Sequence, residues 1–424
     1  MNARETALLT LYDVFFKNAY SNLALSSQLA KAGLSRADTA LATSLVYGTV
    51  SRHFTLEYVI GRYSKIKPKK LDKYIRLILE LGLYQLAFTD KIPESAAVNE
   101  SVKLAKKYGR RGTDGFVNAV LRSFCRDGRE IKYPSKSDRS YLSVRYSYSN
   151  ELAEFFADTF GAGRAESIMD ALNGTPPLLL RVNVLKTDAE GLVKLLQERG
   201  TPAEVVSGAL VKTDGFDIRS SDLYRDGYFT AQDLGAYTAS VVLDPKSGEA
   251  VLDMCAAPGG KTTHIAELMG DDGSVTACDI YDHKVKLIED AANRLGLRSI
   301  CARKLDASVS HEEFKGRFDR VLCDVPCSGL GIIRRKPDIK LGSHDFGALI
   351  GLQSIILRNA ARYLKPGGTL VYSTCTLNPG ENGGVTGGFL NENKDFGCTY
   401  EKTFFPDEDG SDGFYICRME KARG

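Results

Sequence analysis

Two cysteines that directly follow predicted buried strands are the side chains best placed to do chemistry in this sequence. Cys327 lies in the run Asp-Val-Pro-Cys-Ser-Gly at residues 324–329, and Cys375 ends the run Ser-Thr-Cys at residues 373–375. A thiol can act as a covalent nucleophile, although a lone buried cysteine is most often an inert core residue. Two of them at the ends of neighbouring strands, beside a turn that can bind a ligand, argue against the inert interpretation.

That turn follows another predicted strand, at residues 250–254. It consists of Cys255, Ala256, Ala257, Pro258, Gly259, Gly260 and Lys261, and a helical pattern begins near Thr262. Without bulky side chains, such a turn lets a ligand lie against the backbone at a helix N-terminus. A P-loop would need Gly where Cys255 stands, and the Gly-x-Gly-x-x-Gly fingerprint is absent. The turn therefore favours S-adenosylmethionine, which needs neither pattern, with a purely structural turn as the alternative.

Three acidic residues at predicted strand ends extend this candidate site. Asp279 ends the second strand, nineteen residues after Gly260, where a carboxylate can bind ribose hydroxyls or cap a helix. Asp306 ends the third strand and can reach an adenine edge, and Asp324 follows the fourth. Ligands of doubly wound sheets bind outside the carboxyl ends of the strands, so we expect these residues and both thiols to face one pocket.

The elements that must position these residues alternate regularly between strand and helix. Strands are predicted at residues 250–254, 274–280, 300–305, 320–323 and 369–374, and helices at 262–268, 284–295 and 349–364. This alternation predicts a Rossmann-like α/β domain with a parallel sheet between two helical layers. Two strand-like segments at 399–404 and 414–420 predict an antiparallel far edge. Four glycines within residues 383–388 predict a loose helix or a moving segment there.

The first 130 residues contain amphipathic helices with short connections, which predicts a helical bundle. One of its helices is expected to begin at a Ser35 cap and to reach Phe54. This part holds 21 Lys and Arg against 12 Asp and Glu, although the whole chain has a net charge of only +3. The imbalance favours a polyanionic partner, with a solvated basic face as the alternative. A polar linker is expected at 131–150, followed by a small α+β unit whose position suggests that it helps to grip the substrate.

Composition narrows the class of protein further. The nine cysteines form no Cys-x-x-Cys pair and no zinc spacing, so we expect no metal site. Their scattered positions favour a reducing compartment. The N-terminus lacks the apolar core of a signal peptide, and no apolar run is long enough to span a bilayer. We therefore expect a cytoplasmic protein without a membrane partner. A monomer is expected, although no residue pattern fixes the oligomeric state.

Taken together, these motifs resemble those of the RNA 5-methylcytosine methyltransferases. The resemblance rests on residues 253–261, 324–329 and 372–376, and also on Arg334-Arg335-Lys336-Pro337-Asp338 and Glu381-Asn382. Residues 97–102 and 116–122 are similar to the RNA-binding helical domain of the NusB antitermination factors. The resemblance covers nearly the whole chain and is to the bacterial small-subunit (16S) ribosomal RNA cytosine-C5 methyltransferases of the Sun/Fmu type.

The resemblance implies a multidomain chain and a role for each part of it. It implies a NusB-like RNA-binding bundle at 1–130, the linker at 131–150, the small RNA-binding α+β unit at 151–235 and a class I methyltransferase domain at 236–424. S-adenosylmethionine would be the methyl donor, held by the turn at 255–261 with Asp279, Asp306 and Asp324. Ribosomal RNA would be the partner, and the Arg334-Arg335-Lys336 loop would contact its phosphates.

The resemblance also assigns a role to each of the two thiols. Their spacing alone does not show which thiol has which role. It assigns Cys375 to nucleophilic attack, Cys327 to product release and Asp324 to the N3/N4 edge of cytosine. Chemistry supports the need for two thiols: C5 of cytosine is a poor nucleophile, and thiolate addition at C6 activates it. A second group must then take the C5 proton so that the thiolate can leave. The target base must also be unpaired or extruded.

Several alternatives stay open from the sequence alone. Lys261 can contact the base or a phosphate, or lie at the surface. The same chemistry would serve a transfer-RNA methyltransferase. A non-catalytic RNA-binding or antitermination protein could keep the same fold, although Asp279, Asp324, Cys327 and Cys375 are all present.

Overall fold

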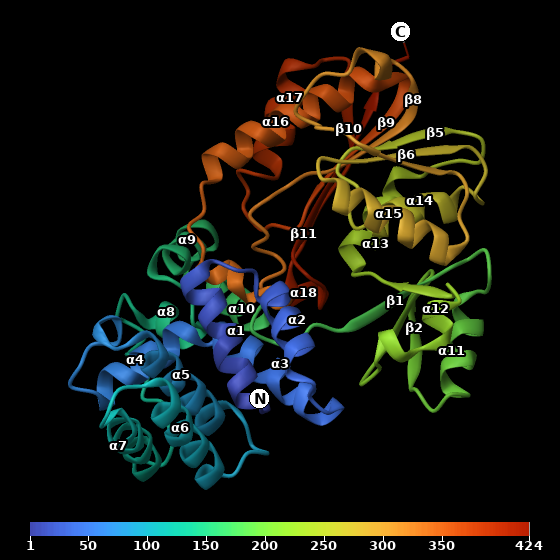
Figure 1. Cartoon of the computed structure of the whole chain (residues 1–424). Coiled ribbons are helices and arrows are strands. Elements are labelled where there is room, and N and C mark those ends of the chain that lie inside the picture. The colour runs from blue at the N-terminus through green and yellow to red at the C-terminus, as the bar shows by residue number, and fades with distance from the viewer. Residues whose placement is uncertain (424) are drawn as a thin grey trace. The chain divides into compact units, whose positions relative to one another are not determined.

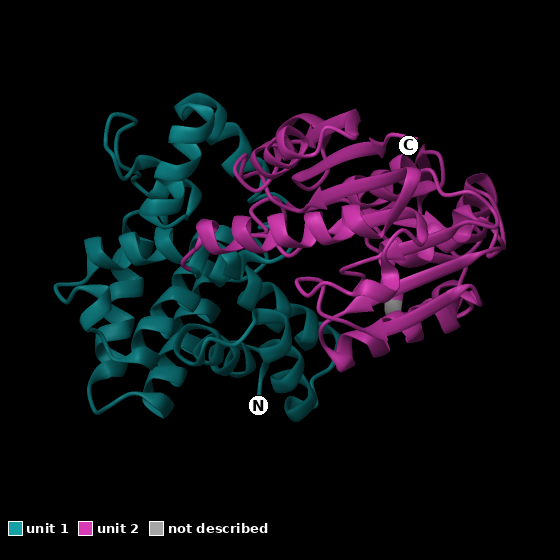
Figure 2. Cartoon of the chain, turned by 90° about the horizontal axis from the view of Figure 1, so that it is seen from above, with its two compact units in different colours: residues 1–174, 333–342 teal, residues 175–332, 343–424 magenta. Residues whose placement is uncertain are grey.

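The computed structural model describes residues 1–423, except for the side chain of Arg219. The chain forms two compact units (Figure 2), one of residues 1–174 with 333–342 and one of residues 175–332 with 343–424. None of the helices in the described residues is long and apolar enough to cross a membrane.

Unit 1 is helical, as the amphipathic pattern predicts for residues 1–130. The structure extends it to residue 174, with α8 (Tyr141–Tyr146) inside the segment that the sequence predicts as a polar linker at 131–150. Its helices are α1 (Ala3–Lys17), α2 (Ser21–Ala32), α3 (Arg36–Ser51), α4 (His53–Tyr63), α5 (Lys73–Phe88), α6 (Glu94–Tyr108), α7 (Thr113–Arg126), α8 (Tyr141–Tyr146), α9 (Asn150–Phe160) and α10 (Ala162–Ala171), with the short helices η1 (Pro68–Lys70) and η4 (Pro337–Leu341). Helix α5 packs against α1, α3, α4, α6 and α7. Its buried leucines and isoleucines therefore form the centre of the bundle core.

The helix predicted from Ser35 to Phe54 is two helices in the structure. Ser35 does cap α3, since its hydroxyl accepts a hydrogen bond from the Asp38 amide at 3.1 Å. At Arg52 the backbone leaves the helical region, with φ −106° and ψ 11°, and α4 starts at the next residue. The apolar spacing continues across this break, so periodicity alone did not reveal it.

The late segment 333–342 belongs to unit 1 because Lys340 anchors it there. The Lys340 ammonium group is buried, and it donates to Ser51 O at 3.1 Å and to the Asn173 side chain at 2.5 Å. It also lies 4.2 Å from the centre of the Tyr148 ring. Burial holds the pKa of this lysine well below its usual range.

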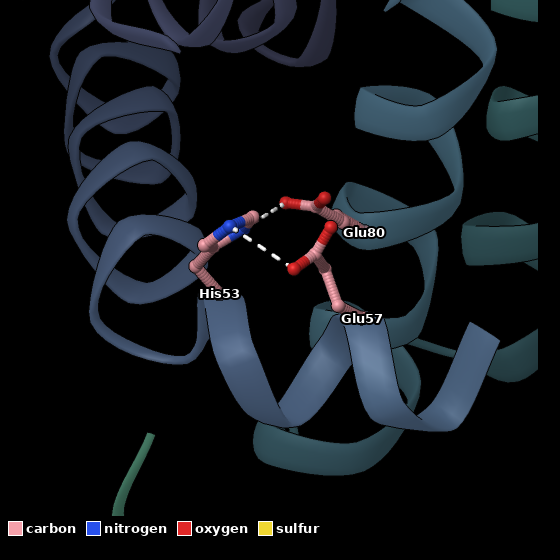
Figure 3. A group of neighbouring side chains, drawn as sticks. All are labelled: His53, Glu57 and Glu80. Carbon is pink, nitrogen blue, oxygen red and sulfur yellow. Dashed lines mark hydrogen bonds and ion pairs between the residues drawn. The ribbon is translucent and has the colours of Figure 1, made fainter. Parts of the chain in front are cut away.

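A buried polar cluster joins α4 to α5 (Figure 3). His53 Nδ1 lies 3.0 Å from Glu80 Oε2, while Arg76 lies 3.0 Å from Glu80 Oε1 and 3.1 Å from His53 Nε2. A guanidinium only donates, so Nε2 accepts from Arg76 and Nδ1 donates to Glu80. Burial raises the pKa of Glu80, but His53 and Arg76 outweigh burial and lower it overall. Although His53, Glu57 and Glu80 are metal-ligand types, Arg76 already supplies the positive charge, so we interpret the cluster as an internal ion network.

Unit 2 begins with a small antiparallel sheet in the order β2-β3-β1-β4. Its elements are β1 (Leu178–Val182), α11 (Ala189–Gln197), β2 (Ala203–Ser207), β3 (Leu210–Thr213), η2 (Ile218–Ser220), α12 (Asp222–Arg225) and β4 (Phe229–Ala231). Leu180 and Val182 of β1 pack with Leu192 and Leu196 of α11. This arrangement agrees in kind with the predicted small α+β unit. The sequence starts that unit at residue 151, however, whereas α9 and α10 belong to unit 1 and unit 2 begins at residue 175.

The rest of unit 2 is a seven-stranded sheet in the order β10-β11-β9-β8-β5-β6-β7. Its strands are β5 (Ala250–Asp253), β6 (Ser274–Asp279), β7 (Ile300–Lys304), β8 (Phe318–Asp324), β9 (Leu364–Thr374), β10 (Phe396–Phe404) and β11 (Phe414–Lys421). The pairs among β5 to β9 are parallel, and β11 pairs antiparallel with both β9 and β10. The parallel sheet and its antiparallel edge are therefore as predicted.

Helices cover both faces of this sheet (Figure 1). They are α13 (Leu234–Leu243), α14 (Gly260–Leu268), α15 (Asp282–Leu295), α16 (Phe346–Tyr363) and α17 (Gly383–Glu392), with the short helices η3 (Glu312–Phe314) and α18 (Pro406–Asp409). One core contains residues of α13, α14 and α15, and a separate core contains residues of α16 and α17. Two cores on one sheet define the three-layer, Rossmann-like architecture.

The glycine-rich segment forms a regular helix, α17, despite its weak helical propensity. Val385 and Phe389 point into the core against α16 and the sheet. The Thr386 hydroxyl lies 2.8 Å from the Tyr415 hydroxyl. Packing of one apolar face thus compensates for the conformational cost of the glycines.

Candidate active site

The candidate site lies at the carboxyl edge of the parallel strands, where the direction of the crossovers changes. β5 leads through α14 to β6 on one side of the sheet, while the neighbouring β8 leads through α16 to β9 on the other. Asp253 at the end of β5 is in register with Leu322 of β8, and Asp324 is in register with Ser373 of β9. The loops after β5, β8 and β9 therefore meet at a switch point, where open α/β sheets bind ligands.

The turn at residues 255–261 has no room for side chains at its centre. Gly259 has φ 101°, and a Cβ there would lie 3.2 Å from the Ile288 Cα. Gly259 is also the N-cap of α14, and no side chain of the described residues caps this helix. The Ala256 amide is tied to Cys278 O at 2.8 Å, which fixes the turn against β6. The free amides of the helix N-terminus are thus left to face a ligand.

One buried carboxylate oxygen of Asp253, beside this turn, accepts no hydrogen bond from the described residues. The Thr262 hydroxyl donates to Oδ2 at 2.7 Å, whereas Oδ1 has no partner. Burial raises the pKa of Asp253 to about 7. An unsatisfied buried acceptor next to an uncapped helix end is an arrangement that a polar ligand would complete.

Asp279 and Asp306 lie at the adjoining strand ends, as the sequence predicts. The Leu305 amide donates to Asp279 O at 3.0 Å, so the two strand ends are neighbours. Asp279 is buried, and its Oδ1 accepts from the Tyr281 amide at 3.2 Å. The Ser308 hydroxyl and amide bind Asp306 Oδ1 and lower the pKa of Asp306. Both carboxylates therefore lie along the edge that continues from the turn at 255–261.

The two cysteines singled out in the sequence lie side by side. Cys327 Sγ is 3.4 Å from Cys375 Sγ, and both are half-buried cysteines outside any disulfide of the described residues. The hydrogen bond with Cys375, together with burial, raises the pKa of Cys327 well above its usual range. Two loops separated by 48 residues in sequence thus bring their sulfur atoms into direct contact.

Lys261 connects the turn at 255–261 to the loop after β8. Its ammonium group donates to Asp324 Oδ2 at 2.6 Å and lies 5.3 Å from the centre of the Phe414 ring. The Ser373 hydroxyl donates to the other Asp324 oxygen at 2.8 Å. Burial lowers the pKa of Lys261, but Asp324 outweighs burial and raises it overall. The lysine is 15% exposed, so the structure favours a site role for it over the surface role.

Arg181 is a residue of this region that the sequence did not indicate. It is fully buried in β1, and it donates to the Gly260 carbonyl at 2.6 Å and to both oxygens of Glu267 at 2.9 and 3.0 Å. Arg181 thereby ties the small sheet to both the first and the last turn of α14. These partners on α14 lie 79 and 86 residues away, and no local pattern in the sequence points to such a distant contact.

Family models match three parts of the chain. The model for the 16S rRNA methyltransferase RsmB/F matches residues 240–420, and the NusB family model matches residues 1–126. A Methyltr_RsmF/B-like, ferredoxin-like domain matches residues 152–212. These matches and the fold define the class: an RNA methyltransferase with a Rossmann-like domain, a ferredoxin-like unit and a NusB-like helical domain.

Full-length relatives narrow this class to a family. The chain is 40% identical to the "Probable ribosomal RNA small subunit methyltransferase B" of Bacillus subtilis over 99% of both chains. It is 34% identical to the "Ribosomal RNA small subunit methyltransferase B" of Erwinia tasmaniensis over 91% of both. The chain therefore belongs to the small-subunit ribosomal RNA methyltransferase B (RsmB/F) family, as the motif resemblance predicts.

Solved structures agree with this architecture. The crystal structure of PH0851 superimposes with a TM-score of 0.81 at 25% identity, covering 98% of this chain and 97% of that one. A methyltransferase homolog protein from Pyrococcus horikoshii superimposes with a TM-score of 0.59 at 30% identity, covering 68% of this chain and all of that one.

Proposed function

We propose that this protein methylates C5 of a cytidine in 16S ribosomal RNA, with S-adenosylmethionine as the donor and a covalent bond between Cys375 and C6 of the base. The observation that carries the proposal is the 3.4 Å contact between two thiols at the carboxyl edge of the sheet. A single thiol would suffice for attack, but only a second group nearby can complete release. Ribosomal RNA as substrate is inferred from the names of the relatives.

The residues around the turn at 255–261 suit S-adenosylmethionine. The backbone of Gly259 and Gly260 leaves space for it, and Asp279 and Asp306 offer carboxylates to its ribose and adenine. The unsatisfied Asp253 oxygen offers one further acceptor. When bound, the donor supplies an electrophilic methyl carbon attached to a sulfonium sulfur.

The attack step is assigned to Cys375. Its thiolate electron pair forms a bond to C6, and the electron pair of the C5–C6 double bond makes C5 nucleophilic. Asp324 is held by Lys261 and Ser373 next to this position, where it can hydrogen-bond the N3/N4 edge of the base. These contacts fix the carboxylate before the base arrives, so little reorganisation is needed.

The release step is assigned to Cys327. Once Cys375 is bonded to carbon, it no longer shares a proton with Cys327 or carries a charge, so its contributions to the raised Cys327 pKa are lost, while those of burial and Glu381 remain. Cys327 can then lose its proton to water and accept the C5 proton as a thiolate. The C5–H electron pair restores the C5–C6 double bond, and the S–C6 pair returns to Cys375. Each cycle releases one proton in total.

The helical domain is proposed to hold the surrounding RNA. Its exposed basic residues include Lys65, Lys67, Lys69, Lys70, Lys106, Lys107, Arg110 and Arg111, and such side chains neutralise phosphates. We keep the proposed functional division into 1–130, 131–150, 151–235 and 236–424, although residues 131–174 pack with unit 1 in the structure. We also propose a cytoplasmic site of action, where ribosomal RNA is found.

Transfer of labelled methyl groups tests this function. The purified chain is incubated with S-adenosylmethionine and, separately, with 16S ribosomal RNA and bulk transfer RNA, and the nucleosides are analysed after digestion. We expect 5-methylcytidine in the 16S RNA only, at one position by bisulfite sequencing. Label in transfer RNA alone would favour the transfer-RNA alternative, and label on another atom or base would refute the C5 chemistry.

A further inference from the structure

Two consecutive residues, Glu381 and Asn382, are the centre of a hydrogen-bond network around both thiol loops. Both side chains are buried, at 0% and 3% exposure. They precede α17, in the loop that follows β9. The chemistry proposed above uses neither residue, although the Glu381 charge helps to raise the pKa of Cys327.

The Glu381 carboxylate holds the backbone on both sides of Cys327. Its Oε2 accepts from the Ser328 amide at 2.9 Å and from Gln353 Nε2 at 2.9 Å. The same Gln353 nitrogen donates to Pro326 O at 3.0 Å. The residues immediately before and after Cys327 are therefore both tied to this carboxylate, one directly and one through Gln353.

The other Glu381 oxygen completes a four-donor shell. Oε1 accepts from the Ser328 hydroxyl at 2.5 Å and from Asn378 Nδ2 at 3.1 Å. Every group facing the carboxylate can donate, which matches its ionised, acceptor-only form. Replacing one oxygen by an amide NH2 would set donor against donor, so a neutral isostere cannot preserve this network.

The Asn382 side chain does the same for Cys375. Its Oδ1 accepts from the Thr374 hydroxyl at 2.6 Å, and its Nδ2 donates to Thr376 O at 3.0 Å. These partners lie immediately before and after Cys375. A hydrogen bond of 2.7 Å between the Ser328 and Thr376 hydroxyls joins the two loops.

We infer that Glu381 and Asn382 are positioning residues with separate targets, Glu381 fixing Cys327 for proton removal and Asn382 fixing Cys375 for attack on C6. This inference rests on the proposed function. Displacement of a reacting group by about 1 Å can cost on the order of a hundred-fold in rate. Because each side chain holds one loop, loss of each should slow a different step.

The test compares Glu381→Gln with Asn382→Ala in the full-length protein, with 16S ribosomal RNA and S-adenosylmethionine. We expect Glu381→Gln to lower turnover about ten- to hundred-fold and to accumulate a covalent protein–RNA complex on denaturing gels. We expect Asn382→Ala to slow methyl transfer in a single turnover by a similar factor, without accumulation of the complex. Affinities for RNA and donor should stay within about two-fold for both.

Milder variants and a control separate positioning from folding. Ser328→Ala and Thr374→Val each remove one hydroxyl from one side of the network and should reproduce the two patterns with smaller factors. Glu249→Gln is the matched control, because Glu249 binds Arg320 at 2.9 Å in the same sheet but at the opposite, amino edge. It should lower stability without changing either rate.

Two results would overturn the inference. One is the same kinetic pattern in Glu381→Gln and Asn382→Ala; the other is unchanged rates in the folded variants. Formation of 5-methylcytidine by the unaltered protein is measured first in the same assay, so failure of the proposed function is recognised independently of these variants.

Discussion

Two pairs of neighbouring thiols occur among the described residues. Their sulfur–sulfur distances are similar, but their surroundings differ. Cys327 and Cys375 are 3.4 Å apart in loops at the carboxyl edge of the sheet, and Cys398 and Cys417 are 3.7 Å apart on the antiparallel strands β10 and β11. Sulfur proximity alone therefore does not identify an active site.

The surroundings of the two pairs explain the distinction. Lys261 interacts electrostatically with Cys375, so the first pair has a cation beside it. Burial raises the pKa of Cys417, and Cys398 and Glu401 raise it further. The first pair also lies beside Lys261 and Asp324, whereas the second lies within the β10–β11 strand pair, whose register shifts between Cys398 and Tyr400. Under the proposed function, loop position and the neighbouring cation distinguish the reactive thiol pair from the other one.

Replacing the proposed nucleophile should have the largest effect on methyl transfer. If it did not, the distinction between the two thiol pairs would be wrong. Cys375→Ser should lower methyl transfer about a thousand-fold or more, because serine is a far weaker nucleophile at neutral pH. Cys417→Ser should keep the rate within about three-fold and cost about 1–3 kcal/mol of stability from the buried hydroxyl. Labelled-methyl assays and urea unfolding measure both. Equal activity loss in the two variants would contradict the assignment.

Replacing the second thiol should give a different defect. Cys327→Ala leaves attack possible but removes the group assigned to the C5 proton, so a covalent RNA complex should persist on denaturing gels. Cys398→Ala, on the exposed partner of the other pair, should give none. A Cys327→Ala protein that turns over normally would show that another base completes the reaction.

Neutralising Lys261, the lysine beside Cys375, should lower turnover less than replacing Cys375. Lys261→Met keeps the aliphatic packing over Phe414 but releases Asp324, so turnover should fall about ten- to hundred-fold. Lys402 is a matched control because it pairs with Asp409 at 3.1 Å and lies 4.2 Å from the centre of the Phe404 ring. Lys402→Met should change turnover by less than about two-fold. Comparable losses would mean that Lys261 acts only through stability.

The sequence predicted most of the α/β domain because its strands are short apolar runs between turn residues. The antiparallel edge at β10 and β11 and the helical nature of the first unit were also predictable. The break at Arg52 was not, since the apolar spacing runs through it. The sequence predicted a loose helix or a moving segment at 383–388, whereas α17 is a regular helix. Its stability comes from burial of Val385 and Phe389 rather than from helical propensity.

The sequence predicted only those parts of the candidate site that lie within short motifs. Strand-end positions and the family motifs indicated both thiols and the turn at 255–261, and the structure brings the sulfur atoms together. The contacts of Arg181 and Glu381 join loops far apart in sequence. Such contacts follow from the packed fold, so no local pattern could specify them.

The central claim is that Cys375 forms the bond to the base while Cys327 stands beside it. Peptide mass spectrometry of the covalent complex from Cys327→Ala, after digestion of the RNA and the protein, tests this claim most directly. We predict a cytidine-derived mass on the peptide that contains Cys375. A nucleotide mass on any other peptide would contradict the account, as would a stable complex that still forms in the Cys327→Ala, Cys375→Ala double variant.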